Sequence, residues 1–174
     1  MNIPRNEGKI FEDAFRDSID ADVIYYERVK DPAASFGGGA KTRFSTHNPY
    51  DSYAYKFPYF FALELKSTKE KSISFSTDDN KKQIKKCQIE GLSRARSYKG
   101  VIAGLVFNFR EQELTYFLDI DNFNKFIEST TKKSINIKDV IDFGGILIPQ
   151  RRKKVKYVYD TNTIFNMIGE ENCE

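Results

Sequence analysis

The stretch that decides the fold is Tyr59–Thr68, which reads YFFALELKST. It opens with apolar residues whose partial alternation is typical of a strand buried on both faces of a sheet. It then places Glu64 and Lys66 two residues apart, and the alternation of a strand points both side chains to the same face. Because burying either charge without a partner costs several kcal/mol, the strand predicts either a salt-bridged pair near its end or a site that uses both charges.

The segment before this strand favours a site. Residues 51–57, DSYAYKF, form a predicted strand that opens with Asp51, and Pro58 and Tyr59 form a predicted turn. An antiparallel hairpin of this kind brings the start of its first strand beside the end of its second, so Asp51 is expected next to Glu64 and Lys66. Two neighbouring carboxylates repel each other and raise one pKa, and a hard cation such as Mg²⁺ relieves that repulsion.

The rest of the chain alternates helical and extended patterns, which predicts a mixed α/β sheet flanked by helices in one domain of 174 residues. Residues 31–50 contain two prolines and three consecutive glycines, which indicates a long, mobile loop. The predicted helices span residues 8–20, 80–98, 121–130, 136–143 and 161–168. The other predicted strands span residues 22–29, 100–109, 113–120, 145–149 and 154–160.

Gln88 stands out on the predicted helix 80–98, where it shares one face with Ile84, Leu92 and Ala95. An amide in an apolar stripe needs hydrogen-bond partners. It is either a satisfied structural amide or an amide turned toward a metal-bound water or a DNA phosphate.

Composition excludes several kinds of chemistry. His47 is the only histidine, and the two cysteines are Cys87 and Cys173. A structural zinc site usually needs four Cys or His ligands, and a Ser–His–Asp triad would depend on His47 alone. With no disulfide framework, no apolar signal segment and no membrane-length apolar run, we expect a soluble cytoplasmic protein with free thiols.

The charge distribution is more informative than the net charge of +3. Lysine and arginine cluster at residues 81–86, KKQIKK, and at residues 151–156, RRKKVK, the latter inside a basic C-terminal extension over about residues 150–174. Such clusters are typical either of a solvated surface or of a nucleic-acid contact.

Asp51, the Glu64-Leu65-Lys66 triplet and Gln88 on a following helix resemble the layout of the PD-(D/E)xK nucleases. The chain as a whole resembles the RecU-type Holliday junction resolvases, also called penicillin-binding-protein-related factor A. The resemblance covers most of residues 2–128, and the tail GGILIPQRRKKVKYVYD is similar to that of phage-borne relatives. The matching stretches are NEGKIFED, DSYAYKFPYFFALELKST, CQIEGLSRA and KGVIAGLVFNFREQELTYFLDIDNFNKFI.

This resemblance implies a restriction-endonuclease-like core and a homodimer that binds branched, double-stranded four-way DNA junctions. The dimer would nick two strands symmetrically with Mg²⁺, or Mn²⁺ as a substitute, and without an organic cofactor. By resemblance, Asp51 and Glu64 ligate the metal, assisted by the Leu65 carbonyl. Lys66 acts on the water and the transition state, and Gln88 supports the site.

The family's first-helix acid falls on Glu12, whereas the apolar periodicity of the helix places Glu7 closer to the centre of its buried stripe. Glu7 also stands where the family often has arginine, and the family's stalk between the first two strands is reduced here to the 31–50 loop. The predicted DNA-backbone contacts are Lys41, Arg43, Lys69, Lys71, Lys81 and Lys85, with Lys82 and Lys86 on the same predicted helix. Phe36, Tyr53 and Tyr55 are candidates for base stacking.

Two alternatives remain open from the sequence. One is a restriction-type or repair nuclease that acts on duplex DNA. The other is a non-catalytic DNA-binding scaffold of the same fold, against which the intact set of Asp51, Glu64 and Lys66 argues.

Overall fold

The computed structural model describes residues 6–29, 48–79, 81–154 and 156–170. Its centre is a six-stranded sheet in the order β1-β2-β3-β5-β6-β8. Strands β3 and β5 run parallel and the other neighbours run antiparallel, so the sheet is mixed, as the sequence predicts. The strands are β1 (Tyr25–Arg28), β2 (Ser52–Lys56), β3 (Tyr59–Thr68), β5 (Val101–Phe109), β6 (Leu114–Asp119) and β8 (Ile146–Leu147).

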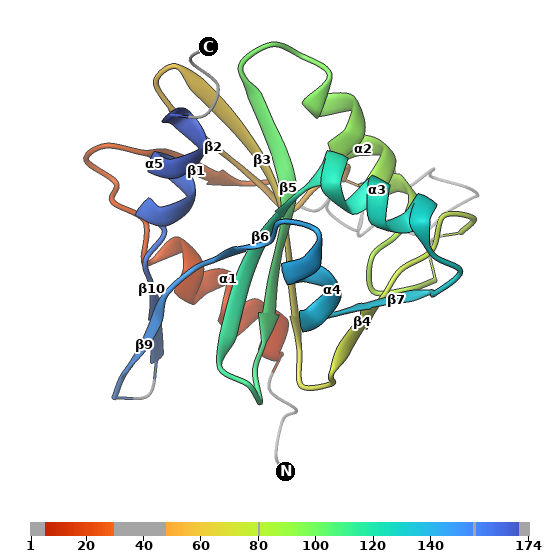
Figure 1. Cartoon of the computed structure of the whole chain (residues 1–174). Helices are drawn as coiled ribbons and strands as arrows, with labels where there is room; N and C mark the ends of the chain where they lie inside the picture. Colours follow the sequence, from red (N-terminus) through yellow and green to blue (C-terminus); the bar gives the residue numbers. More distant parts are fainter. Residues whose placement is uncertain (1–5, 30–47, 80, 155, 171–174) are drawn as a thin grey trace, which may run out of the picture.

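Helices cover both faces of this sheet (Figure 1). One face carries α2 (Lys86–Arg96), α3 (Ile120–Ser129) and α4 (Ile137–Asp142), and the other carries α1 (Glu7–Arg16) and α5 (Asn162–Glu170). Successive residues of β3 serve opposite cores, since Ala62 packs in the α2 cluster and Leu63 in the α1 cluster. The predicted burial of β3 on both faces is therefore confirmed.

Two small sheets complete the described fold. Strand β4 (Ser72–Ser74) pairs with β7 (Ser134–Asn136), and β9 (Gln150–Lys153) pairs with β10 (Lys156–Tyr159). The sequence did not predict β4, β7 or β9, because three-residue strands are too short to show a period and QRRK has no apolar alternation. The basic run at residues 151–156 is thus part of a β-hairpin, which packs beside α1.

The predicted start of the second helix was wrong. Helix α2 begins at Lys86, with Lys85 as its N-cap, so Lys81 and Lys82 precede the helix. Ile84 is buried but extended: its backbone N–H donates to the carbonyl of Ser74 at 2.9 Å, and its own carbonyl accepts from Ser76 at 3.1 Å. The spacing from Ile84 to Gln88 fits a helix, which explains the wrong prediction. In the structure, Ile84 pairs instead with the segment around Phe75.

The helix predicted over residues 121–130 begins one residue earlier, at Ile120 of α3. Asp119 caps it, since the Asp119 side chain accepts from the backbone N–H of Asp121 at 2.8 Å. The short helix predicted over residues 136–143 is confirmed as α4, capped by Asn136. None of the helices in the described ranges is long and apolar enough to cross a membrane.

A close approach between β5 and β6 requires glycine at position 104. A Cβ atom at Gly104 would lie 2.4 Å from the carbonyl oxygen of Leu118 and 2.6 Å from the ring of Phe117. We therefore predict that Gly104→Ala lowers the free energy of unfolding by about 1–3 kcal/mol, the usual cost of overpacking. Urea denaturation would measure this change.

Gly8→Ala is the matched control, because a Cβ at Gly8 meets only the Asn6 side chain at 3.5 Å and alanine favours helix α1. The control should not lose stability. Equal stability of the two variants would contradict the tight β5–β6 contact.

Candidate active site

The β2–β3 hairpin brings Asp51 to Glu64. Ser52 pairs with Leu63, so Asp51 lies opposite Glu64 in the continued register. The backbone N–H of Asp51 donates to the carbonyl of Leu63 at 3.2 Å, and Asp51 Oδ2 accepts from the backbone N–H of Leu65 at 3.0 Å. The hairpin predicted from the sequence is confirmed, and a carboxylate takes the place of a strand partner for Leu65.

Glu64 is fully buried at the centre of this arrangement. Its Oε1 atom accepts from Lys66 Nζ and from Gln88 Nε2. Its Oε2 atom has no hydrogen-bond partner among the residues that the structure describes. Burial raises the pKa of Glu64 to about 8, because the attraction of Lys66 only partly offsets desolvation and the charge of Asp51 adds to it.

Lys66 stays charged in this pocket. Burial by itself lowers the pKa of its ammonium group, but Glu64, Asp51 and Glu12 outweigh that effect and raise the pKa above its ordinary value. The cation is therefore held beside two carboxylates in a poorly solvated position, where its field acts with little screening.

Gln88 links the second helix to Glu64. Its Oε1 accepts from the backbone N–H of Lys85, the N-cap of α2, at 2.9 Å, while its Nε2 donates to Glu64. Both polar ends of the amide therefore have protein partners. Gln88 fixes the orientation of the Glu64 carboxylate and the start of α2 together.

Helix α1 places Glu12, rather than Glu7, near Asp51. Glu12 lines a depression together with Asp51, Arg28 and Leu65, whereas Glu7 forms an ion pair with Arg110 at 3.4 Å. Burial and the charge of Asp51 raise the pKa of Glu12, while Arg28 and Lys66 oppose that rise. The apolar periodicity favoured Glu7, which it placed nearer the centre of the buried face of α1. The depression that Glu12 lines lies at the margin of that face.

Arg28 is a site residue that sequence reasoning missed. Its Nη2 atom lies 2.8 Å from Glu12 Oε2, and it pairs with Ser52, the neighbour of Asp51, across the β1–β2 ladder. The pairing of β1 with β2 places Arg28 here. The sequence did not indicate this position, because a long segment separates the two strands and their register could not be predicted.

The predicted DNA contacts are spread more widely. Lys69 and Lys71 are exposed on the turn after β3, Lys81 is exposed before α2, and Lys85 is half-buried at the N-cap. Tyr53 stacks on Phe60 with ring centroids 5.6 Å apart, and Tyr55 is exposed. The predicted mobile loop 31–50 falls almost wholly outside the described residues, together with Phe36, Lys41, Arg43 and His47; so does Cys173.

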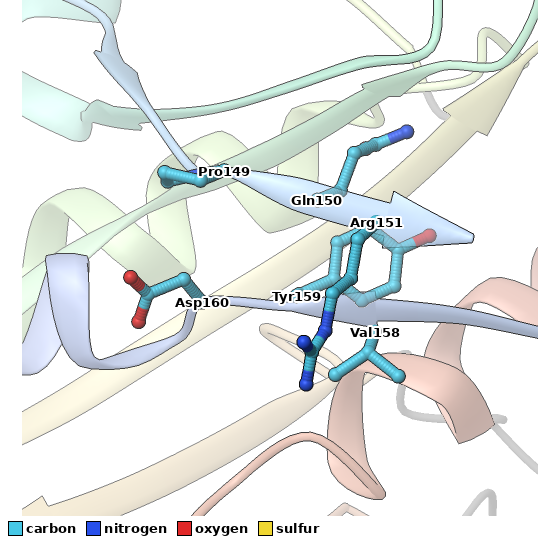
Figure 2. A pocket seen from close by; sticks show the side chains of 6 residues that line it. All are labelled: Pro149, Gln150, Arg151, Val158, Tyr159 and Asp160. Carbon is cyan, nitrogen blue, oxygen red and sulfur yellow. The ribbon is translucent and has the colours of Figure 1, made fainter. Parts of the chain in front are cut away.

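A separate hollow of about 400 Å³ lies at the base of the β9–β10 hairpin (Figure 2). Its lining includes Arg151 and Asp160 but no residue of β2, β3 or α2. The cluster around Glu64 is therefore the candidate active site, and this hollow belongs to another part of the molecule.

A mixed sheet flanked by helices, with Asp51 beside the Glu64-Leu65-Lys66 triplet on a central strand, places the protein in the class with a restriction-endonuclease-like core of the PD-(D/E)xK type. A family model described as RecU, Recombination protein U, matches residues 41–162. The chain belongs to the RecU family.

Two further comparisons found proteins similar to this chain. The SPbeta prophage-derived uncharacterized protein YotM of Bacillus subtilis (strain 168) is 34% identical over 173 residues, which cover 91% of this chain and 85% of that protein. The structure of Hjc, a Holliday junction resolvase from the archaeal hyperthermophile Archaeoglobus fulgidus, is 20% identical with a TM-score of 0.43. That match covers 71% of this chain and 82% of the other.

The raised pKa of Glu64 predicts how stability varies with pH in a chelator. The folded protein holds this proton up to a pH of about 8, whereas an unfolded chain releases it near 4.5. The stabilisation is therefore complete below about pH 4.5 and is lost as the pH rises toward 8, by up to about 1.4 kcal/mol per pH unit. Urea unfolding in EDTA at several pH values would measure it.

Glu64→Gln should flatten this pH dependence, because the amide does not titrate. Glu90→Gln, on the exposed side of α2, is the matched control and should leave the dependence unchanged. Identical pH dependences in the wild type and Glu64→Gln would contradict the assignment.

Proposed function

We propose that this protein is a metal-dependent endonuclease that resolves four-way DNA junctions by paired phosphodiester hydrolysis. The observation that carries the proposal is the buried Glu64 carboxylate, held between Asp51 and Lys66 in a chain of the RecU family. Paired nicks in a two-fold symmetric junction call for two active sites, so the proposal includes a homodimer.

The donor atoms at this site fit a hard divalent cation. Glu64 Oε2 is buried with no hydrogen-bond partner in the described part of the chain, and the Asp51 carboxylate lies next to it. The Leu65 carbonyl points to the same side of β3 as its N–H, which meets Asp51. These are oxygen ligands, which suit Mg²⁺ or Mn²⁺.

The described residues hold no preassembled group of three or more His, Cys, Asp or Glu side chains around one point. Two carboxylates and one carbonyl still match Mg²⁺, which keeps several water molecules as ligands. Glu12 pairs with Arg28, and the charges of Asp51 and Lys66 both act on its pKa. It is therefore available as a further carboxyl group of the site.

The residues then divide the work of hydrolysis. A bound cation supplies a Lewis acid for a non-bridging phosphate oxygen and lowers the pKa of a water ligand. The Lys66 ammonium orients the attacking water and stabilises the negative charge that develops on the phosphate. Gln88 holds Glu64 in position. The water oxygen forms a bond to phosphorus as one P–O ester bond breaks. The attacking water releases one proton to solvent and the leaving oxygen takes one up from solvent, so the step is balanced.

Nuclease activity on linear duplex DNA and a non-catalytic scaffold are the competing functions. The buried carboxyl group argues against a scaffold. Holding Glu64 beside Asp51 lowers the stability of the fold, and DNA binding alone does not require this arrangement. The choice between junction and linear duplex rests on membership of the RecU family and requires a direct comparison of substrates.

Asp51→Asn should lower junction cleavage at least about 100-fold while leaving the fold intact. The Asn carbonyl oxygen can still accept from the Leu65 N–H, so the change removes the charge but keeps the hydrogen bond seen at 3.0 Å. Cleavage of a labelled four-way junction and of a linear duplex of the same sequence would be compared in Mg²⁺.

Asp142→Asn is the matched control, because this exposed acid pairs with Lys138 on α4 and does not line the depression beside Asp51. Paired nicks in the junction by wild type and Asp142→Asn support the proposal. Faster cutting of the linear duplex favours the restriction or repair function, and tight binding without cleavage in Mg²⁺ and in Mn²⁺ favours the scaffold.

Metal dependence has its own readout. We predict that activity is lost in EDTA and restored by Mg²⁺ or Mn²⁺, and that Mg²⁺ at 100 times its Kd stabilises the wild type by about 2.7 kcal/mol. Asp51→Asn should show much less stabilisation, because one proposed ligand has lost its charge. Full cleavage in EDTA, or equal stabilisation of both proteins, would contradict the metal site.

A further inference from the structure

We propose that the β9–β10 hairpin is a second DNA-binding element, which holds the sugar–phosphate backbone of a duplex arm beyond the end of the central sheet. This inference rests on the proposed function, since it adds a contact to the same substrate. It differs from the active site in residues, in exposure and in the way that it can be tested.

The hairpin carries a dense, exposed positive charge. Its five exposed basic residues are Arg151, Arg152, Lys153, Lys154 and Lys156. Among the described residues, Lys156 alone of these five forms an ion pair, with Asp17 at 3.6 Å. Cations crowded together without counter-charges repel one another, and a polyanion with regularly spaced phosphates relieves that repulsion while releasing its own counterions.

A buried polar chain fixes this hairpin to the catalytic strand. Ser67, which follows Lys66 in β3, donates to Asn108 Oδ1 at 2.9 Å, and Asn108 Nδ2 donates to Thr115 Oγ1 at 2.9 Å. The Thr115 hydroxyl in turn donates to Gln150 Oε1 at 2.5 Å. These bonds join β3, β5, β6 and β9. The bond between Asn108 and Thr115 is buried, where water competes little for it, and the bonds at the two ends are part-buried.

The side chains at the base of the hairpin point in different directions and make different contacts. Gln150 and Arg151 project from β9 in different directions, with Gln150 reaching Thr115 and Arg151 lining the hollow at the hairpin base (Figure 2). Tyr157 donates to Glu113 in the turn between β5 and β6. Because β3 runs parallel to β5, this turn lies at the end of the sheet toward which β3 runs after Lys66 (Figure 1).

The hairpin is therefore an exposed cationic arm on a rigid base, held at the end of the sheet toward which the catalytic strand leads. Lysine and arginine side chains of this kind bind phosphates without reading base sequence. The inferred ligand is accordingly duplex DNA of any sequence, bound through its backbone. If the hairpin were only a solvated charged surface, removing its charges would weaken DNA binding no more than removing the same number of charges elsewhere on the surface.

The test measures junction binding without cleavage. In the Asp51→Asn background and in EDTA, the triple variant Arg151→Gln, Arg152→Gln, Lys153→Gln would be compared with Lys99→Gln, Lys125→Gln, Lys133→Gln. Both triple changes remove three exposed positive charges, and the control residues lie after α2, on α3 and before β7. Fluorescence anisotropy with a labelled four-way junction and a linear duplex over a range of KCl concentrations gives the salt dependence of Kd.

The hairpin variant should reduce the slope of log Kd against log salt by about 2 to 3, since each lost phosphate contact is worth about 0.9. It should also weaken binding at least about tenfold, while the control changes the slope by less than about 0.5. Equal effects of the two triple variants, or an unchanged slope in the hairpin variant, would overturn the inference. The double variant Arg151→Lys, Arg152→Lys retains the charge and should keep the salt slope of the wild type. A reduced slope in this variant would show that the structure of the hairpin, not its charge, is responsible, and would also overturn the inference.

Failure of the two proposals can be told apart. If the wild type resolves junctions in Mg²⁺ and the hairpin slope is unchanged, the hairpin inference alone fails. If the wild type does not cleave and the hairpin variant still lowers the slope on linear duplex, the hairpin inference stands and the proposed function fails.

Discussion

The burial of the Glu64 carboxyl group is the constraint on which the rest of the site depends. A carboxyl group taken out of water needs hydrogen bonds, and its ionised form also needs a compensating positive charge. Lys66 and Gln88 satisfy one of its oxygens, and the other has no hydrogen-bond partner among the described residues. Because Gln88 also accepts from the backbone N–H of Lys85 at the start of α2, the same amide sets the start of that helix and the orientation of the carboxyl group.

The sheet makes room for this carboxylate at the point where β2 begins. Up to Leu63, β3 has a backbone partner in β2, but at Leu65 the partner is the side chain of Asp51. The edge of β3 is thereby open to a ligand without leaving its N–H unsatisfied. Helix α1 and strand β1 then bring Glu12 and Arg28 to the same depression, where the two side chains form an ion pair.

Chemistry and DNA binding make opposite demands on side chains. The role proposed for Lys66 depends on its burial and weak screening, whereas the contact proposed for Arg151 and Arg152 depends on their exposure. The hydrogen bonds from Ser67 through Asn108 and Thr115 to Gln150 join the strand that carries Lys66 to the hairpin that carries the two arginines.

The sequence by itself determined the β2–β3 hairpin and the meeting of Asp51 with Glu64 and Lys66. A short turn and a period of two fix the register, so local pattern is sufficient there. The spacing of the same residues also pointed to the RecU family, and the apolar strands gave the mixed sheet.

Only the tertiary structure decided the start of α2, the choice of Glu12 over Glu7, the presence of Arg28 and the folding of the basic run into a hairpin. Ile84 matches a helical spacing but pairs with the segment around Phe75, and β9 has no apolar period, although β10 and the hydrogen bond from Thr115 to Gln150 hold it as a strand. These features depend on backbone pairing and on contacts between elements, and apolar periodicity contains no information about either.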